Sequence, residues 1–419
     1  MSNDYKHNHY VPEWYQKRFL PRGQNKHYYL DLAPDRVTSE GHTYTREALL
    51  RWGPARCFAQ DDLYTTTWGG LENRDIEKFF FGKLDTVGKS AVEHFAEFTL
   101  RDGSHEAFEA LVPYMSVQKL RTPKGLGWLR QVSGGVSKNK TLILLQDIQN
   151  VFCAIWTECV WQIADASRSP TKFIISDHPV VTYNRECFPA SKYCRVYNDP
   201  DIRFAATHTF FPLSPDKVLI LTNLSWVRDP FQNPLKLRPN PNFFRGAIFN
   251  FLSIQVDRFL TEEEVREINY ITKKRAFRYV AAAEEEWLYP ERHLQSDHWR
   301  KLGDGYLFMP DPRHIHGGGE VAIGYEGGQS DAFGAYGHKP WQRGYKDKER
   351  DDREWAAMQK FKVEWAAMHG PGYRGIVHDM GGREARLSMG KEWYDEECKR
   401  DKEYLKRPGE AARRRRLRR

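Results

Sequence analysis

The sequence contains no long apolar run. A membrane-spanning helix needs about 20 consecutive apolar residues, and the best candidate, residues 141–163, is interrupted by Gln146, Asp147, Gln149 and Glu158. The first ten residues, MSNDYKHNHY, lack the apolar segment of a secretion signal. We therefore expect an intracellular, cytoplasmic protein that has no membrane partner.

Metal-site and cofactor motifs are also missing. The six cysteines form no CxxC pair, which argues against a zinc ribbon or a disulfide framework. Two HxH pairs, His7 with His9 and His314 with His316, have no acidic or cysteine partner nearby, so no metal is predicted. The P-loop, Rossmann, HExxH, GxSxG and kinase patterns are absent as well. These absences disfavour nucleotide-driven motors, Rossmann dehydrogenases and α/β-hydrolases, and they leave any cofactor unidentified.

The composition predicts a large hydrophobic core and a C-terminal region of different character. Of the 419 residues, 40% are hydrophobic and 14% are aromatic, a composition that disordered chains do not have. Residues 303–345 are rich in Gly, and the formal net charge of +8 is concentrated in residues 407–419, RPGEAARRRRLRR. We expect one globular domain over residues 1–290 and a Gly-rich, charged extension over residues 291–419.

Hydrophobic periodicity predicts three long helices in the first half of the chain. A stripe of apolar residues marks Glu72 to Phe98, spaced three and four apart as in an amphipathic helix. The second predicted helix runs from Glu106 to Arg121, where Thr122-Pro123 ends it, and the third runs from Leu142 to Ala166. The stripe consists of Ile76, Phe80, Leu84, Val87, Ala91, Phe95 and Phe98.

Strand signals follow these helices. Residues 172–176 and 180–183 flank a turn, and residues 209–211 and 218–222 flank another, which predicts a small antiparallel sheet near residues 170–225. Thr261 and Glu264 match a capping box, and we expect the helix that they open to continue to about Glu286. The predicted fold is α+β, with a mainly helical body. Near the C-terminus, the repeated segments Glu354–Met358 and Glu364–Met368 fit one broad helix face, although local duplication alone would also explain them.

Six segments resemble one protein family in the same order along the chain. They are HYVPEWYQKRF from His9, DDLY from Asp61 with Glu72 and Ile76-Glu77, QKLRTP from Gln118, FIISDHP from Phe173, FPLSP from Phe211, and Ile268-Asn269 with RYV from Arg278. Together they resemble the domain of unknown function 4238 family over about residues 7–283. The chain departs from the family pattern at Gln16, where Leu is usual, and at His178, where Asn is usual. The resemblance implies the extent of a domain and no particular chemistry.

Five polar residues in these segments are candidates for catalysis. Asp177, Glu72 and His9 could act as acid, base or metal groups, and Gln118 and Arg121 share a helix face from which they could hold a phosphate. Two structural alternatives stay open. Asp177 could simply make a turn, and Arg121 could pair with a carboxylate such as Glu72 or Glu77.

The C-terminal tail supplies a second kind of candidate site. Its six clustered arginines can bind phosphates, and they have no scaffold for reading bases. The preferred function is therefore nucleic-acid association, with RNA or DNA, as a binding or assembly component. A nuclease-like enzyme that uses the five residues above is the alternative, and an enzyme acting on a small molecule is a further one. The tail arginines are Arg413, Arg414, Arg415, Arg416, Arg418 and Arg419.

Overall fold

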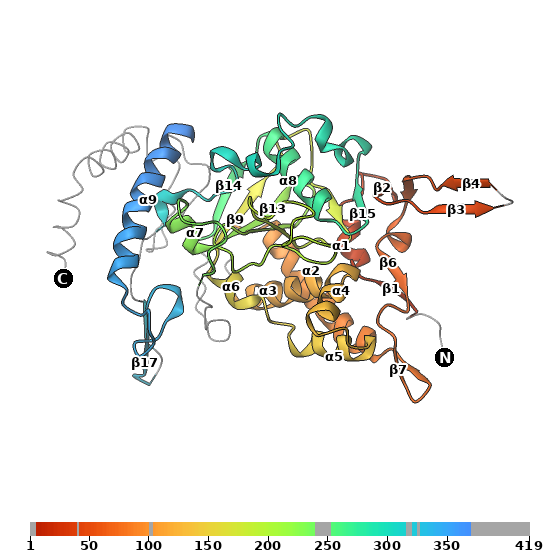
Figure 1. Cartoon of the computed structure of the whole chain (residues 1–419), viewed down its shortest axis with the longest axis horizontal. Coiled ribbons are helices and arrows are strands. Elements are labelled where there is room, and N and C mark those ends of the chain that lie inside the picture. The colour runs from red at the N-terminus through yellow and green to blue at the C-terminus, as the bar shows by residue number, and fades with distance from the viewer. Residues whose placement is uncertain are drawn as a thin grey trace.

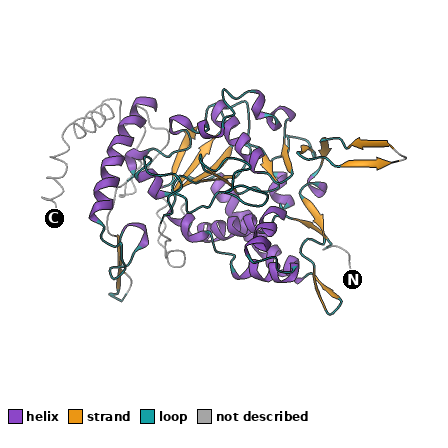
Figure 2. Cartoon of the chain, in the orientation of Figure 1, coloured by secondary structure: helices purple, strands orange, loops and turns teal. Residues whose placement is uncertain are grey.

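The computed structural model describes residues 6–39, 42–99, 104–238, 253–315, 321–324 and 327–369. A five-stranded sheet lies at the centre, with α8 on one side and the helices α2 to α6 on the other (Figure 1). Helix α9 stands at the edge farthest from the N-terminus, and thin hairpins project at the opposite edge (Figure 2). Among the described residues, no helix is both long and apolar enough to cross a membrane.

The central sheet has the strand order β11-β12-β13-β9-β14. Its neighbouring strands are antiparallel except β14, which runs parallel to β9. The expected hairpin around residues 209–222 is confirmed, because β12 pairs with β13 along its whole length. The strands are β9 (Val160–Asp165), β11 (Val181–Tyr183), β12 (His208–Pro212), β13 (Lys217–Thr222) and β14 (Gln255–Phe259).

Strand β9, which lies between β13 and β14, corrects the third predicted helix. The segment from Leu142 to Ala166 divides into α5, α6 and β9. All six residues of β9 are buried, since neighbouring strands and packed helices cover both faces. A segment buried on every side has no alternation of polar and apolar residues, so periodicity cannot distinguish it from a buried helix.

A second sheet has the strand order β10-β15-β2-β5. It corrects the helix opened by Thr261, whose capping box is present as predicted but whose last residue is Arg275. Residues that were expected to prolong this helix form β15, which pairs with β2. The strands are β2 (His27–Asp31), β5 (Leu49–Trp52), β10 (Ile175–Ser176) and β15 (Tyr279–Ala282).

The strands predicted around Asp177-His178-Pro179 therefore belong to different sheets. Strand β10 pairs with β15 in the second sheet, and β11 pairs with β12 in the central sheet. The turn between them carries the chain from one sheet to the other. Four two-stranded hairpins or ribbons complete the strands: β1 (His7–His9) with β6 (Ala59–Asp61), β3 (Arg36–Ser39) with β4 (His42–Thr45), β7 (Thr66–Trp68) with β8 (Leu71–Asn73), and β16 (Val321–Gly324) with β17 (Ser330–Phe333).

Helices cover the two sheets. The second predicted helix is confirmed as α3, which begins after the capping residue Ser104 and contains Pro113. The α-helices are α1 (Glu13–Lys17), α2 (Gly82–Ala96), α3 (His105–Leu120), α4 (Pro123–Val132), α5 (Lys138–Asp147), α6 (Cys153–Glu158), α7 (Leu224–Arg228), α8 (Glu262–Arg275) and α9 (Lys348–His369). Short 3-10 turns lie at Pro54–Arg56, Glu285–Leu288, Pro290–Arg292, Trp299–Lys301, Asp304–Tyr306, Pro312–His314 and Ala335–Gly337.

The first predicted helix differs from the structure at its start. Residues 71–73 form strand β8, and the helical segment opens with a π-helix, Ile76–Phe81, before α2. The wider π turn moves the buried face by one residue, so Phe81 is fully buried, Phe80 is half-buried and Val87 is exposed. The expected stripe is therefore fully buried only in its C-terminal half, at Ala91 and Phe95. Ile76, Phe80 and Leu84 are partly buried against the core, and Val87 is the exposed exception.

Phe81→Ala should consequently destabilise the protein more than Phe80→Ala. Removing a fully buried aromatic ring costs about 3–5 kcal/mol, whereas a half-buried ring loses less contact area. We expect the two free energies of unfolding, measured in urea, to differ by about 2 kcal/mol. Equal losses would mean that the π turn does not set the register of this face.

The main core extends past residue 290. Trp299, Leu302 and Phe308 belong to the same apolar cluster as the central sheet and α3. Helix α9 contains both repeated Glu-Trp-Ala-Ala-Met segments, and its Phe361 and Trp365 pack in a cluster with Trp226 of α7. The proposed boundary at residue 290 stays a prediction. The α+β class is confirmed, although "mainly helical" understates the sheets.

A buried histidine in the central sheet should make part of the stability depend on pH. His208 lies among Tyr183, Phe210 and Phe308, and its Nδ1 is 3.0 Å from the hydroxyl of Thr222. Burial, helped by the charge of Arg258, lowers its pKa to about 3. The unfolded chain takes up this proton below about pH 6.5 and the folded chain does not, so stability is lost as the pH falls through this range.

His208→Asn removes that proton and keeps a polar partner for Thr222. Between pH 7 and pH 5, we expect wild type to lose about 2 kcal/mol of unfolding free energy relative to this variant. Comparing the variant with wild type isolates His208 from other buried groups that titrate in the same range. Parallel pH profiles for the two proteins would contradict the assignment.

Candidate functional site

The structure distributes the five predicted site residues over separate local contacts. Glu72 is exposed on β8, where it pairs with Arg74 at 2.7 Å. His9 ends β1, and its Nε2 lies 3.7 Å from Glu13. Gln118 and Arg121 do lie together, since the Gln118 side-chain oxygen accepts from Nε of Arg121 at 2.8 Å.

Arg121 is a buried structural group with a partner that differs from both expected carboxylates. Its guanidinium donates to both oxygens of Asp85, at 3.1 and 2.8 Å. The neighbouring Glu77 has its pKa raised to about 7 by burial, which the charge of Arg121 only partly opposes. The donors of Arg121 are therefore committed to Asp85 of α2 and Gln118 of α3, which leaves little for a phosphate.

Asp177 is likewise occupied by the protein itself. Its carboxylate accepts from the backbone amides of Phe277, Arg278 and Tyr279 at 2.8, 2.6 and 2.9 Å. Burial raises its pKa to about 6, although these three bonds favour the charged form. Asp177 therefore holds the turn after β10 against the start of β15, through bonds to residues about 100 positions away rather than through the local turn bonding of the structural alternative.

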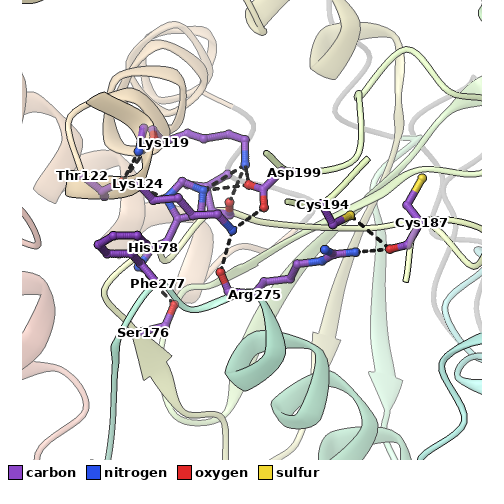
Figure 3. A network of polar contacts seen from close by, with 12 residues as sticks. Lys119, Thr122, Lys124, Ser176, His178, Cys187, Cys194, Asp199, Arg275 and Phe277 are labelled. Carbon is purple, nitrogen blue, oxygen red and sulfur yellow. Dashed lines mark hydrogen bonds and ion pairs between the residues drawn. The ribbon is translucent and has the colours of Figure 1, made fainter. Parts of the chain in front are cut away.

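A cluster of ionisable side chains lies immediately beside these residues (Figure 3). Asp199 accepts from Nζ of Lys119 through one oxygen and from Nζ of Lys124 through the other, both at 2.5 Å. His178 places Nε2 at 2.8 Å from Asp199 and Nδ1 at 2.8 Å from the hydroxyl of Thr122. The side chains of Lys119, Asp199 and His178 are only 8%, 9% and 2% exposed.

Four segments of the chain bring this cluster together. Lys119 is in the last turn of α3, and Thr122 caps α4 by accepting from the amide of Gly125 at 3.1 Å. His178 follows β10 in the turn that joins the two sheets. Asp199 comes from the long connection between β11 and β12.

Burial and neighbouring charges shift the pKa values of three groups in the cluster. Burial alone would raise the pKa of Asp199, but the charges of Lys119 and Lys124 outweigh it and hold that pKa well below its usual range. Burial, together with the charge of Lys119, lowers the pKa of His178 to about 3, so its ring is neutral. Burial also lowers the pKa of Lys119, while Asp199 opposes the shift. In formal charges, two lysines face one aspartate, an excess of one positive charge.

Part of this cluster forms the wall of a cavity of about 720 Å³, which we call the first cavity. Its walls combine the polar groups of Lys119, His178 and Asp199 with aromatic side chains. This volume lies within the roughly 300–1,000 Å³ of ordinary small-molecule sites, which are mostly apolar with a few polar groups. The aromatic lining residues are Trp128, Phe152, Tyr193, Tyr197 and Phe204.

The arrangement is unsuited to nucleophilic catalysis by Thr122. A hydroxyl, an imidazole and a carboxylate are in line here, as in hydrolase triads. However, Thr122 is fully buried and its oxygen already accepts from the amide of Gly125, so a substrate cannot reach it. Within the described part of the chain, no group of three or more His, Cys, Asp or Glu side chains could hold a metal ion. Lys119 lines the first cavity, and its Nζ already donates to Asp199 and to the carbonyl of Val180.

Comparison with known proteins identifies a similar family but no activity. Residues 128–286 match the model of a family described as protein of unknown function (DUF4238). The resemblance to this family is confirmed over residues 128–286, whereas its predicted extension back to about residue 7 stays a prediction. The matched segment includes β9, the His178 turn, Asp199 and α8, and it leaves out Lys119 and Lys124. No curated protein and no solved structure matches the chain.

Sequence reasoning selected neighbours of the cluster and missed its members. Lys119 and Thr122 lie within the QKLRTP segment, and His178 follows Asp177, so these positions were within reach of the motif search. Asp199 had no local signal, because its partners come from other elements. The tail residues Arg413, Arg414, Arg415, Arg416, Arg418 and Arg419, and His316, lie outside the described residues.

Proposed function

We propose that the globular body binds a nucleotide in the first cavity, with the phosphate at Lys119 and the base among the aromatic side chains. The observation that carries this proposal is the buried Lys119–His178–Asp199 cluster in the wall of an aromatic cavity. A lysine ammonium is a common phosphate partner, and stacking of a base on an aromatic ring contributes about 1–3 kcal/mol. The cluster and the cavity therefore support a small-molecule function for the globular body.

The cavity also offers groups that could contact the polar edges of a base. Asn198 and Asp201 line it beside Tyr197. Asp201 is held by Arg203 through a bidentate contact, with Nε at 3.1 and 3.0 Å from its two oxygens. Since Lys119 already bonds to Asp199, a phosphate would share this ammonium and would be attracted by the excess positive charge of the cluster.

Calorimetric titration with the four ribonucleoside 5′-monophosphates, and with the corresponding nucleosides, tests this proposal. Lys119→Gln should weaken a bound monophosphate about tenfold or more, because it removes a charge-assisted contact. Binding of the nucleoside, which has no phosphate, should change little. Lys217→Gln is the matched control, since Lys217 pairs with Asp165 at 2.7 Å on the central sheet, away from this cavity.

Two results would count against nucleotide binding. Wild type could bind none of the four monophosphates, or Lys119→Gln could weaken nucleoside and nucleotide equally. The second result would indicate a distorted cavity rather than a lost phosphate contact.

We further propose that the C-terminal tail binds nucleic acid, RNA or DNA, without sequence preference. This rests on the run of four arginines from Arg413 to Arg416, followed by Arg418 and Arg419. Each neutralised phosphate releases condensed counterions, so about six contacts would make the affinity fall steeply with salt. The same protein could then bind a nucleotide in its body and a polynucleotide through its tail.

Deleting residues 407–419 should abolish most of this binding and flatten its salt dependence. The measurement is the affinity of full-length and truncated protein for mixed-sequence RNA and DNA across a salt series. Anionic vesicles in the same series distinguish a nucleic-acid site from a membrane site. Unchanged nucleic-acid affinity after truncation would exclude the tail.

Phosphodiester cleavage by His9, Glu72, Gln118, Arg121 and Asp177 stays an untested hypothesis. The contacts described above give each of these residues a partner within the protein.

A further inference from the structure

A second cavity, of about 660 Å³, lies beside the first one. Helix α4 contributes to both walls: Gly125 and Trp128 line the first cavity, whereas Leu126, Gly127, Arg130 and Gln131 line the second. Residues in a helix advance by about 100° each, so these two sets lie on different sides of α4. Tyr197 is the residue that lines both cavities.

The ring of Tyr197 is fixed from two directions. It stacks on Phe277, with ring centroids 5.6 Å apart and an angle of 29° between the planes. It also lies so close to Gly127 that a Cβ atom at that position would be 2.4 Å from two ring atoms. Only glycine allows this approach, so the close packing of Tyr197 against α4 is built into the sequence.

The second cavity contains a cation that is available to a ligand. The guanidinium of Arg130 makes no hydrogen bond or ion pair with any other side chain that the structure describes, and Arg130 is exposed. The acidic lining residues are already engaged, since Asp61 bonds to His7 at 2.7 Å and Asp62 lies near Lys6 and Arg74. A guanidinium can donate two parallel hydrogen bonds to a phosphate.

We propose that Tyr197 determines which length of ligand the protein binds, by confining a nucleotide to the first cavity and separating it from a second phosphate subsite at Arg130. This inference rests on the proposed nucleotide binding. With the ring in place, a second nucleotide attached to the first cannot pass to Arg130, and it adds no affinity. Without the ring, the two cavities become one continuous site for a dinucleotide.

The test compares the monophosphate that binds most tightly with the dinucleotide that extends it at the 3′ end. Wild type should bind the two with similar affinity. Tyr197→Ala should bind the dinucleotide about tenfold more tightly than the monophosphate, through the added phosphate contact. Tyr197→Ala combined with Arg130→Gln should lose that gain, and Tyr197→Phe, which keeps the ring, should behave as wild type.

Two further variants keep the test interpretable. Gly127→Ala displaces the same ring from the α4 side while it favours the helix, and it should also raise the preference for the dinucleotide. Tyr193→Ala changes the wall of the first cavity only, and it should weaken both ligands without changing their ratio.

The possible outcomes distinguish a failure of this inference from a failure of the proposed nucleotide binding. The inference is overturned if wild type already prefers the dinucleotide, or if Tyr197→Ala and Gly127→Ala both leave the ratio unchanged while the monophosphate still binds. If wild type binds no monophosphate, the proposed nucleotide binding itself is wrong.

Discussion

Asp199→Asn is expected to destabilise the folded protein by about 3–5 kcal/mol, because it leaves two buried ammonium groups without their carboxylate. Lys119 and Lys124 each lie 2.5 Å from a different oxygen of Asp199, and both lysine side chains are less than a tenth exposed. Lys119 would keep the carbonyl of Val180, and Lys124 would keep the carbonyl of Arg275. The partial negative charges of these carbonyl oxygens do not replace the full charge of the Asp199 carboxylate. Urea unfolding at neutral pH measures the loss.

A matched control lies two residues along the same loop. Asp201 pairs with Arg203, but both side chains are partly exposed, at 32% and 46%. Water screens such a pair, so Asp201→Asn should cost only about 0–1 kcal/mol. If the two variants lost equal stability, the loop rather than the charge pairing would be the cause.

The fold was predictable where local pattern and tertiary environment agree. Helix α3 has a capping serine, an apolar face and a stop at Thr122-Pro123, and the hairpin of β12 and β13 is joined by a short turn. Strand β9 was not predictable, because its six buried residues take their conformation from β13 and β14 on either side. The π turn before α2 could not be predicted either, since a helical periodicity of 3.6 residues assumes regular winding.

The sequence predicted the region of the site but not the residues that form it. The motifs around Gln118 and Asp177 mark the end of α3 and the turn after β10, which do meet, because Thr122 touches His178. Within each motif, however, the residue chosen as a catalytic candidate is buried and bonds to a structural partner. Arg121 bonds to Asp85, and Asp177 bonds to backbone amides. Asp199 joins the cluster from a loop, and a single sequence contains no signal for contacts across 80 residues, such as that with Lys119.

Asp177 is where the catalytic and structural interpretations of the sequence can be separated by experiment. A catalytic carboxylate must present a lone pair to a substrate, whereas Asp177 is about 1% exposed and points its oxygens at three consecutive backbone amides. Those amides lie at and just before the start of strand β15, which pairs with both β10 and β2. The carboxylate thus fixes the end of α8 relative to the second sheet.

Asp177→Ala should therefore cost about 3 kcal/mol or more of unfolding free energy, because three partly buried amides each lose an acceptor at about 1 kcal/mol or more. Asp177→Asn keeps the shape and one acceptor oxygen, but its amide group would face a backbone N–H, so we expect an intermediate loss. Urea unfolding of both variants, together with cleavage assays on RNA and DNA, separates the two interpretations. Stable variants that had lost a cleavage activity of the wild type would restore Asp177 as a catalytic residue. Unstable variants, whose remaining folded fraction binds nucleotide normally, would establish it as the residue that holds β15 in place.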